Sequence, residues 1–447
     1  MSRVSIIGAG LAGSLLAIYL ARRDIKVDVY EARGDMRLEK MSAGRSINLA
    51  LSDRGIAALR EVGMARHVLS EAVPMYGRKI HAPDGGTKLL SYSGREGEHI
   101  NSVSRGGLNI ALMNAAERQS GVTFHFNHRC TGFDSQTGEV RFADGKIITT
   151  DTVIATDGAG SPIRRSMFDG VVDRFNFSQI WLEHGYKELH IPAGSNAHRF
   201  AIEPHALHIW PRHKFMMIAL PNFDGSFTCT LFLAHHGSAA EPGFDQLTDP
   251  TAVSDFFTRE FPDAVPLMPT LADDFFANPT GDLGTVKCWP WHVGGKALLL
   301  GDSAHAVVPF YGQGMNCAFE DVRILDTLID EYGVDWASIY PQYAAVRKPN
   351  TDAIAEMAEE NFYEMRDATA DPVFQSKRII ETRLENTFPD YFSKYSMVTF
   401  REDLPYSLAK QRGNVQDEIL MEIAASTTDP NTVDLNEVRE RLKAAQT

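Results

Sequence analysis

The chain has 447 residues, 44% of them hydrophobic and 23% charged, a composition that excludes disordered and fibrous proteins. Its formal net charge of −14 argues against a nucleic acid or an anionic membrane as partner, since both require a basic face. Its four cysteines are widely spaced, which excludes a disulfide scaffold and fits a reducing, cytoplasmic compartment. No apolar stretch is long enough to span a bilayer. The 15 histidines do not cluster at metal-ligand spacing, so we expect no metal site.

The first thirty residues have the pattern of a strand, a helix and a second strand. An apolar strand over residues 4–7 leads into Gly8, Gly10 and Gly13, which open a mostly apolar helix. This glycine spacing permits a tight turn and lets backbone N–H groups approach a pyrophosphate. Glu31 follows the second strand and can accept hydrogen bonds from an adenosine ribose. The pattern predicts dinucleotide binding but does not separate FAD from NAD.

The middle of the chain has a different pattern. Strand-like runs at 207–210, 215–220 and 227–233 are separated by turns rich in Pro, Asn, Asp and Gly. They predict an antiparallel meander, inserted into the dinucleotide fold over residues 175–285. Helical patterning dominates after the strand-like run at 297–300.

We therefore predict an α/β fold with three parts. A Rossmann-like dinucleotide-binding domain is formed by residues 1–174 and 286–335. An antiparallel-sheet substrate domain covers residues 175–285, and a mostly helical C-terminal region covers residues 336–447.

Two further motifs narrow the choice of cofactor. One strand-like run ends in the pair Asp157-Gly158, another ends in Gly301-Asp302, and Gly314 opens a predicted helix. Alone, each pair is most often a simple turn. Combined with the N-terminal glycines, they resemble the motifs of class A FAD-dependent aromatic hydroxylases. The resemblance implies FAD as cofactor and NADPH as co-substrate. NADPH would dock transiently, because a second glycine fingerprint is absent.

Five longer strings carry a closer resemblance, which extends from Ser5 to about Tyr406. Within the family, they are similar to the members that hydroxylate L-kynurenine. They are Gly44–Leu51, Glu203–Pro211, Phe215–Asn222, Pro309–Asn316 and Tyr395–Phe400. Two positions depart from the family pattern: Tyr311, where other members carry His or Phe, and Thr156, where small residues or cysteine are common. Animal members carry a membrane-anchoring C-terminal extension that this sequence lacks, so we expect the soluble form of bacterial members.

The resemblance also implies how the substrate is held. Arg78 and Tyr92 match residues that bind the substrate carboxylate, and Asn361 and Tyr395 match further polar contacts to the amino-acid end. A planar guanidinium suits this role because it binds a carboxylate through two hydrogen bonds. From its residue type alone, Arg78 is more often an ordinary surface arginine in an ion pair. The residues implied around the aromatic ring are Ile218, Leu220, Phe232, Pro309, Phe310 and Gln313.

The contacts to FAD are implied in the same way. Asp302 matches the residue that binds the ribityl chain, Asp157 matches one that contacts flavin and nicotinamide nucleotides, and Arg105 matches an arginine near the flavin. The helix that begins near Gly314 is expected to direct its positive end at the flavin N1–C2 carbonyl region, which suits an anionic reduced flavin. The expected cofactor contacts are Gly8, Gly10, Leu11, Gly13, Glu31, Arg33, Arg105, Asp157, Asp302, Gly314, Met315 and Asn316.

The reaction implied by the resemblance is hydroxylation of L-kynurenine to 3-hydroxy-L-kynurenine by NADPH and O₂, through a flavin C4a-hydroperoxide. The aniline amino group of kynurenine activates the ortho carbon of its ring, so we expect no catalytic side chain. The protein contributes positioning, stabilisation of the flavin anion and exclusion of water. A homodimer is one assembly that the resemblance allows.

Three other interpretations remain open at this stage. An NAD-dependent dehydrogenase requires only the first glycine motif, and such a protein would be colourless. A non-catalytic FAD-binding regulator would show no substrate-stimulated oxidation of NADPH. A class A hydroxylase of another aromatic compound, such as salicylate or anthranilate, would share all the cofactor motifs.

Overall fold

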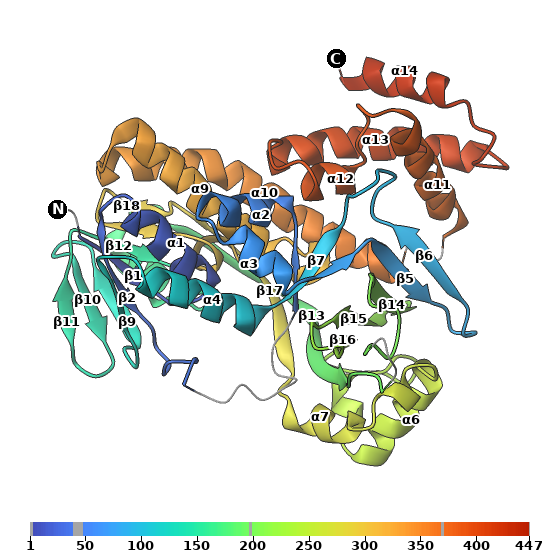
Figure 1. Ribbon diagram of the computed structural model, residues 1–447, viewed down its shortest axis with the longest axis horizontal. Helices are drawn as coiled ribbons and strands as arrows, with labels where there is room; N and C mark the ends of the chain where they lie inside the picture. Colours follow the sequence, from blue (N-terminus) through green and yellow to red (C-terminus); the bar gives the residue numbers. More distant parts are fainter. Residues whose placement is uncertain (1–2, 39–47, 196–198, 368–370, 447) are drawn as a thin grey trace.

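The computed structural model describes residues 3–38, 48–195, 199–367 and 371–446 (Figure 1). Residues 44–47, the first part of one string of the resemblance, lie outside these ranges. The chain has an α/β fold with a helical C-terminal region, as predicted. The N-terminus and the C-terminal helix α14 (Leu435–Gln446) lie at opposite ends of the molecule.

A six-stranded sheet carries the predicted strand–helix–strand unit. Its order is β18 (His292–Val293), β19 (Ala297–Leu299), β12 (Thr152–Ala155), β1 (Arg3–Ile7), β2 (Lys26–Tyr30) and β8 (Val122–His125). All neighbouring pairs are parallel except β18 and β19. The helix α1 (Leu11–Ala21) follows β1 and contacts α4 (Arg105–Glu117) and α9 (Gly314–Tyr332). The strand cores are buried on both faces, as expected for parallel strands covered by helices.

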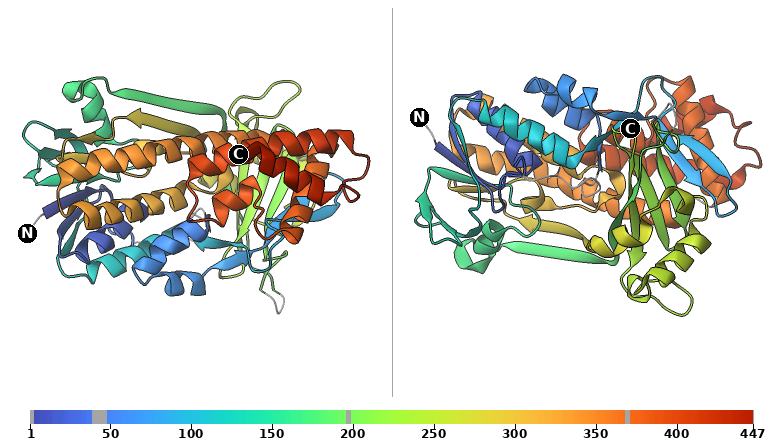
Figure 2. Two further views of the ribbon diagram at one scale, coloured as in Figure 1. Left: turned by 90° about the horizontal axis from the view of Figure 1, so that it is seen from above. Right: turned by 60° about the horizontal axis from the view of Figure 1, so that its bottom comes forward.

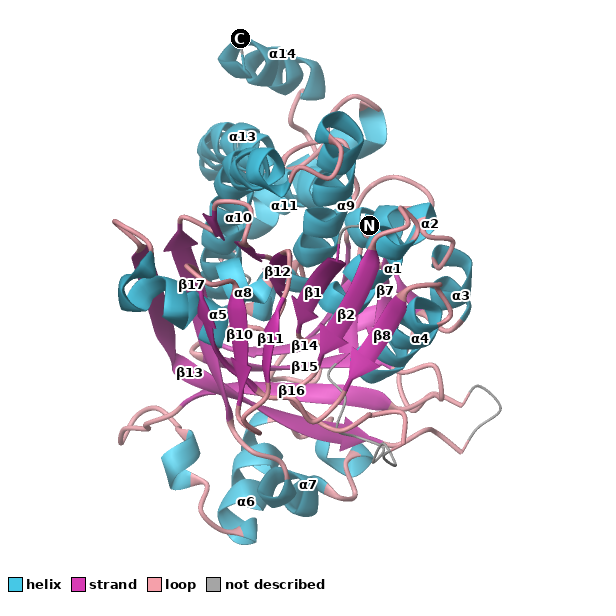
Figure 3. Ribbon diagram, turned by 90° about the vertical axis from the view of Figure 1, so that its left-hand side faces the viewer, coloured by secondary structure: helices cyan, strands magenta, loops and turns pink. Residues whose placement is uncertain are grey.

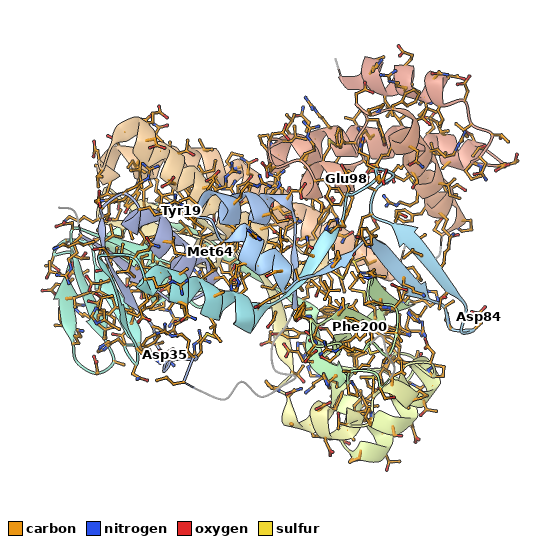
Figure 4. All side chains as sticks on the ribbon, in the orientation of Figure 1. Tyr19, Asp35, Met64, Asp84, Glu98 and Phe200 are labelled. Atoms are coloured by element: carbon orange, nitrogen blue, oxygen red, sulfur yellow. The ribbon has the colours of Figure 1, made fainter. Side chains whose placement is uncertain are left out.

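The helix α2 (Asp53–Glu61) packs beside α1. Tyr19, labelled in Figure 4, lies on α1. Its hydroxyl donates a hydrogen bond to the carbonyl of Ala58, on α2, at 2.7 Å. Further elements that lie between α1 and α9 in the sequence are β3 (Asn48–Leu51), α3 (Ala65–Ser70), β4 (Val73–Met75), β7 (Ile100–Ser104), β9 (Cys130–Asp134), β10 (Glu139–Phe142), β11 (Ile147–Thr149), α5 (Pro162–Ser166) and α8 (Asp302–His305).

A seven-stranded sheet contains the predicted meander. Its order is β17 (Gly281–Trp289), β13 (Asn176–Ile191), β16 (Phe227–Ala234), β15 (Phe215–Pro221), β14 (Ala206–Arg212), β5 (Gly77–His81) and β6 (Thr87–Ser91). The strands β14, β15 and β16 pair antiparallel, so the predicted meander is confirmed. The hairpin of β5 and β6 extends the sheet by parallel pairing of β5 with β14, and the sequence did not predict this addition.

The two faces of the seven-stranded sheet have different coverings. One face packs on α6 (Pro250–Glu260) and α7 (Leu271–Ala277), which lie beneath the strands in Figure 3. Trp210, Met217 and Leu231 enter this core. The other face, with Met216 and Phe232, packs on α10 (Trp336–Asp367) and on the turn before α9. The second face therefore meets the dinucleotide-binding fold and the C-terminal helices.

The C-terminal region is helical, as predicted. The long helix α10 runs beside α9, and the other helices gather at its far end (Figure 2). They are α11 (Pro372–Thr387), α12 (Lys394–Thr399), α13 (Tyr406–Ser426) and α14. Buried Val438 and Leu442 fix α14 against the core formed by α11 and α13. In the described parts of the chain, no helix combines the length and the apolar composition that a membrane crossing requires.

Candidate active site

The three expected cofactor motifs meet at one edge of the six-stranded sheet. They follow the neighbouring parallel strands β1, β12 and β19, and the carboxyl ends of such strands lie at the same edge. Hydrogen bonds tie the three turns together. Thr156 donates from its hydroxyl to the carbonyl of Gly8 at 2.8 Å, and Ser303 donates to the carbonyl of Ala155 at 2.6 Å. This edge is where an open α/β sheet binds its ligand.

The glycines of the first turn have different roles. Gly8 has a φ of +106°, and a Cβ there would lie 2.5 Å from the carbonyl oxygen of Thr156. A Cβ on Gly13 would lie 2.1 Å from the carbonyl oxygen of Gly8, so both glycines are required by packing. A Cβ on Gly10, at the N-terminus of α1, would meet no described atom within 4 Å. The space beside Gly10 fits a phosphate approaching the first N–H groups of the helix.

Glu31 lies at the end of β2, with its carboxylate buried against the glycine turn. It accepts hydrogen bonds from the backbone N–H of Ala9 at 2.9 Å and from Nε of Arg33 at 2.8 Å. Burial raises the pKa of Glu31, but the hydrogen bonds and charge of Arg33, with the N–H of Ala9, bring that pKa below its ordinary value. Glu31 is therefore an ionised acceptor, as ribose recognition requires.

The carboxylate of Asp157 lies in the second turn and is shielded from solvent. Neither of its oxygens has a hydrogen-bond partner among the described residues, and burial raises the pKa of this carboxyl group to about 6. A buried polar group without a partner is costly, and a ligand hydroxyl or N–H group would satisfy it. Asp302 is exposed at the start of α8, after Gly301 with a φ of +66°. The two aspartates thus fit a polyhydroxylated cofactor at this edge.

The start of α9 is fixed by side chains that face away from solvent. Asn316 donates to the carbonyls of Ala50 and Gly312 at 2.8 and 2.9 Å and accepts from the N–H of Ser52 at 3.0 Å. Its amide is thus engaged in holding the helix N-terminus, which leaves the backbone of the first turn of α9 to act on a cofactor. Arg105 is exposed at the start of α4. Leu11 and Met315 each lie in the first turn of a helix, α1 and α9.

The substrate residues Arg78, Tyr92 and Tyr395 come together from β5, the residue after β6, and α12. The rings of Tyr92 and Tyr395 stack at 5.2 Å, and the guanidinium of Arg78 lies 5.0 Å from the Tyr395 ring centroid. Nε of Arg78 and the hydroxyl of Tyr92 are buried and have no hydrogen-bond partner among the described residues. Burial raises the pKa of Tyr92 well above its usual value, so this hydroxyl is a neutral donor. Two unsatisfied donors side by side fit a carboxylate ligand.

Two adjoining pockets meet at Arg78 and Tyr395. The first is lined by Arg78, Ile80, Leu90, Ser91, Tyr92, Ile209, Glu364, Met365, Phe374, Arg378 and Tyr395. The second is lined by Arg78, Tyr311, Met357, Glu360, Asn361, Glu364, Lys377, Arg378, Glu381, Lys394, Tyr395 and Asp417. The expected residue Asn361 belongs to the second pocket, where its amide donates to the carbonyl of Phe310 at 2.6 Å.

The expected ring contacts line the sheet face beside these pockets. The ring of Phe310 lies 5.0 Å from that of Phe232, while Ile218 and Leu220 pack with Tyr92 in a neighbouring apolar cluster. Two expected residues differ in exposure: Pro309 is exposed, and Gln313 is buried. The side chain of Gln313 accepts a hydrogen bond from the hydroxyl of Tyr406 at 2.9 Å.

The sequence did not predict several residues that line the pockets, among them Glu364 and Arg378. Glu364 is half-buried on α10 and lines both pockets, and Arg378 on α11 pairs with Glu381 at 2.8 Å. Glu364 follows Asn361 by three residues, a spacing that places both on one face of a helix. That spacing was a usable signal, but the neighbouring acidic residues made the face resemble a solvated one.

Comparisons with known proteins agree with this geometry. Residues 1–205 and 274–356 match the family model described as FAD binding domain. Kynurenine 3-monooxygenase from Myxococcus xanthus is 46% identical over 455 aligned positions, which cover 99% of this chain and 95% of that protein. The protein of the same name from Dictyostelium discoideum is 44% identical and covers 96% of this chain and 94% of its own length.

Solved structures share the fold at lower identity. The tetrameric form of 2-methyl-3-hydroxypyridine-5-carboxylic acid oxygenase has a TM-score of 0.68 at 20% identity, covering 88% of this chain and 99% of that one. PqsL from Pseudomonas aeruginosa, in complex with 2-aminobenzoylacetate, has a TM-score of 0.66 at 18% identity, covering 82% and 97%. The FAD-binding match gives no support to an NAD-dependent dehydrogenase. The chain belongs to the kynurenine 3-monooxygenase family and is an FAD-dependent monooxygenase.

Proposed function

We propose that this protein hydroxylates L-kynurenine to 3-hydroxy-L-kynurenine, with NADPH and O₂ as co-substrates. The proposal rests on a pair of buried donors beside an apolar sheet face, Nε of Arg78 and the hydroxyl of Tyr92, which no described residue satisfies. An amino acid with an aromatic side chain supplies both the carboxylate and the ring. The names of the full-length relatives support kynurenine as that amino acid.

The amino-acid end of the substrate is assigned to charged groups of both signs. Arg78 and Tyr92 bind the carboxylate, and Tyr395 stacks beside them. Glu364 lines both pockets next to Arg78, so it is positioned to accept hydrogen bonds from the α-ammonium group. A zwitterion bound in this way leaves no charge of the ligand unpaired.

The ring end is assigned to the apolar face of the sheet. Phe232, Phe310 and Ile218 exclude water there. The aniline amino group of kynurenine donates electron density to its ortho carbon, so the reaction needs no side chain acting as a base. Hydroxylation at the 3-position then follows from the placement of the ring.

The cofactor is assigned to the edge of the six-stranded sheet. The N–H groups next to Gly10 hold the pyrophosphate, Glu31 accepts from the ribose, and Asp157 and Asp302 accept from the flavin portion. FAD bound there would, once reduced by NADPH, activate O₂, and O₂ would supply the oxygen atom transferred to the ring. The N-terminus of α9 stabilises negative charge on the reduced flavin.

The proposal also covers the cellular compartment and the oligomeric state of the enzyme. The four cysteines are all unpaired and buried, which supports a reducing, cytoplasmic compartment. We also propose a homodimer as the assembly to test.

The test uses the purified, yellow protein. NADPH oxidation is measured with L-kynurenine, anthranilate and salicylate in separate reactions, and products are identified by mass. We expect stimulation by L-kynurenine and a product heavier by one oxygen atom. Hydroxylation of anthranilate or salicylate in place of L-kynurenine would transfer the assignment to another aromatic substrate. FAD binding without oxidation of NADPH by any of the three would support the non-catalytic interpretation.

A further inference from the structure

A buried chain of alternating charges connects the substrate end of the site to the cofactor end. Glu320 accepts from Nη1 of Arg54 at 2.7 Å and from Nη1 of Arg347 at 2.5 Å. Nε of Arg347 donates to one oxygen of Asp321 at 2.6 Å, and the other oxygen of Asp321 lies 2.6 Å from Nε2 of His305. All five side chains are buried. They link α2, α8, α9 and α10 through one continuous series of ion pairs and a hydrogen bond.

The cofactor end of this chain holds the third cofactor motif. The oxygen of Asp321 that contacts His305 also accepts a hydrogen bond from the backbone N–H of Gly301, at 3.1 Å. Gly301 immediately precedes Asp302, the residue assigned to the flavin portion of FAD. The position of Asp321 therefore determines the position of this turn.

Part of this chain consists of residue types that can bind a metal ion, but the carboxylate of Asp321 is already paired with Arg347. His305, Cys317 and Asp321 have ligand atoms within 4.8 Å of one another. The guanidinium of Arg347 lies 2.6 Å from Asp321 and takes the place that a cation would need. The cluster is part of the ionic chain and not a separate metal site.

The substrate end of the chain holds the segment that carries Tyr395. Nε of Arg54 donates to the carbonyl of Val398, on α12, at 2.9 Å, and Nη2 donates to the carbonyl of Leu404. The guanidinium also lies 3.9 Å from the ring centroid of Tyr406. Arg54 thus fixes α12 from within the dinucleotide-binding part of the chain. A lysine has one ammonium and cannot reach these groups and Glu320 together.

We propose that Arg54 is a positioning residue that aligns Tyr395, and with it the substrate, with the cofactor. This inference rests on the proposed function. Buried ion pairs add little net stability compared with apolar groups of the same size, but displacement of one member leaves a charge unpaired. The chain through Glu320 and Asp321 therefore permits one arrangement of α12 relative to the Gly301 turn. Misalignment would let activated oxygen leave as hydrogen peroxide.

The experiment compares wild type with Arg54→Lys and Glu320→Gln. Glu320→Gln keeps the size of the side chain and removes the carboxylate that pairs with Arg54 and Arg347. Productive turnover consumes NADPH, H⁺, O₂ and kynurenine and yields NADP⁺, water and 3-hydroxykynurenine. Unproductive turnover consumes NADPH, H⁺ and O₂ and yields NADP⁺ and H₂O₂. The readouts are hydroxylated product per NADPH, KM for L-kynurenine, FAD content and Tm.

We expect Arg54→Lys to retain FAD, to raise KM, to lower product per NADPH, and to lower kcat/KM by up to about 100-fold, the cost of a displacement near 1 Å. Glu320→Gln should lower product per NADPH in the same way, because Arg54 loses its carboxylate partner. The control is Arg23→Lys, because Arg23 follows the end of α1 and forms its ion pairs with Asp326 and Asp330 on the same helix α9. It should lower Tm without changing product per NADPH.

The outcomes separate the two proposals. A wild-type enzyme that forms no product from L-kynurenine contradicts the proposed function. An active wild type whose product per NADPH and KM are unchanged in Arg54→Lys contradicts the positioning role. If Arg54→Lys does not fold, Glu320→Gln decides in the same way, because it removes the ionic partner of Arg54.

Discussion

The rings of Tyr92 and Tyr395 stack with their centroids 5.2 Å apart and their planes 11° from parallel. The two residues come from distant parts of the sequence, one directly after β6 and the other on α12. Their stack forms an aromatic wall beside the guanidinium of Arg78. The rings thus provide packing, and the polar groups around them are left to recognise a ligand.

Removal of the Tyr92 hydroxyl should weaken binding of L-kynurenine without lowering the stability of the fold. This hydroxyl is buried and has no hydrogen-bond partner in the described part of the chain, so Tyr92→Phe removes an unsatisfied donor and keeps the ring stack. We expect Tm without substrate to be unchanged or higher, and the Kd for L-kynurenine to rise about 10-fold from loss of one hydrogen bond to a charged group. Thermal unfolding and flavin-absorbance titration measure the two quantities. A lower Tm with an unchanged Kd would assign Tyr92 to packing alone.

Substitution of Arg78 should weaken substrate binding more strongly. Arg78→Ala removes a charged, two-pronged donor, and we expect the Kd for L-kynurenine to rise about 10- to 100-fold, equivalent to about 1.5–3 kcal/mol. Arg78→Lys keeps the charge and loses the planar geometry, so it should recover only part of the affinity. Calorimetric titration of both variants is the measurement. Equal affinity of wild type and Arg78→Ala would remove Arg78 from the site.

Glu364 should recognise the α-ammonium group specifically. Glu364→Gln is expected to weaken L-kynurenine binding about 10-fold, because a charge-assisted hydrogen bond is lost. The affinity for a kynurenine analogue without the α-amino group should be the same in the variant and in wild type. An equal loss for both ligands would indicate a general change in the pocket and would contradict the assignment.

Alanine substitutions at two glycines of the first turn should have different effects, one on FAD binding and the other on stability. Gly10→Ala should fold with a Tm close to that of wild type but lose FAD, because its methyl group enters the space assigned to the pyrophosphate. Gly13→Ala should lower Tm, because its Cβ would lie 2.1 Å from the carbonyl oxygen of Gly8. Visible absorbance and thermal unfolding distinguish the two effects. Full FAD content in Gly10→Ala would place the pyrophosphate elsewhere.

The buried carboxyl of Asp157 predicts a pH effect on the FAD-free protein. Its folded pKa of about 6 lies above the ordinary value of 3.8. Stability from this group is therefore complete below pH 3.8 and is lost as the pH rises through 6. Asp157→Asn should raise the free energy of unfolding by about 3 kcal/mol at pH 7 and by less at pH 5, because the amide does not ionise. Urea unfolding at both pH values is the measurement, and an equal effect at both would contradict an unpaired buried carboxylate.

The sequence predicted the parts of the fold that depend on local patterns. The glycine turn before α1 and the meander of β14, β15 and β16 follow from short-range turn chemistry and apolar runs. The pairing of β5 with β14 does not, because its partner residues, Gly77 and Ala206, are far apart in the sequence. Parallel pairing of this kind depends on the tertiary arrangement.

For the site residues too, local sequence patterns do not predict what depends on tertiary packing. No local pattern distinguishes Arg78 from a surface arginine, and only the family resemblance identified it. Glu364 and Arg54 have the residue type and helical spacing of solvated charges, yet one lines the pockets and the other is buried. Their roles depend on packing between helices, which periodicity does not specify.

The addition of β5 and β6 to the sheet has a consequence for engineering. Residues 77–91 supply the strand that carries Arg78, and the rest of the sheet comes from residues 176–289. A chimera that exchanges only residues 175–285 with a relative would combine a foreign ring surface with the original arginine strand. Transfer of substrate preference between relatives therefore requires the hairpin and the meander to be exchanged together.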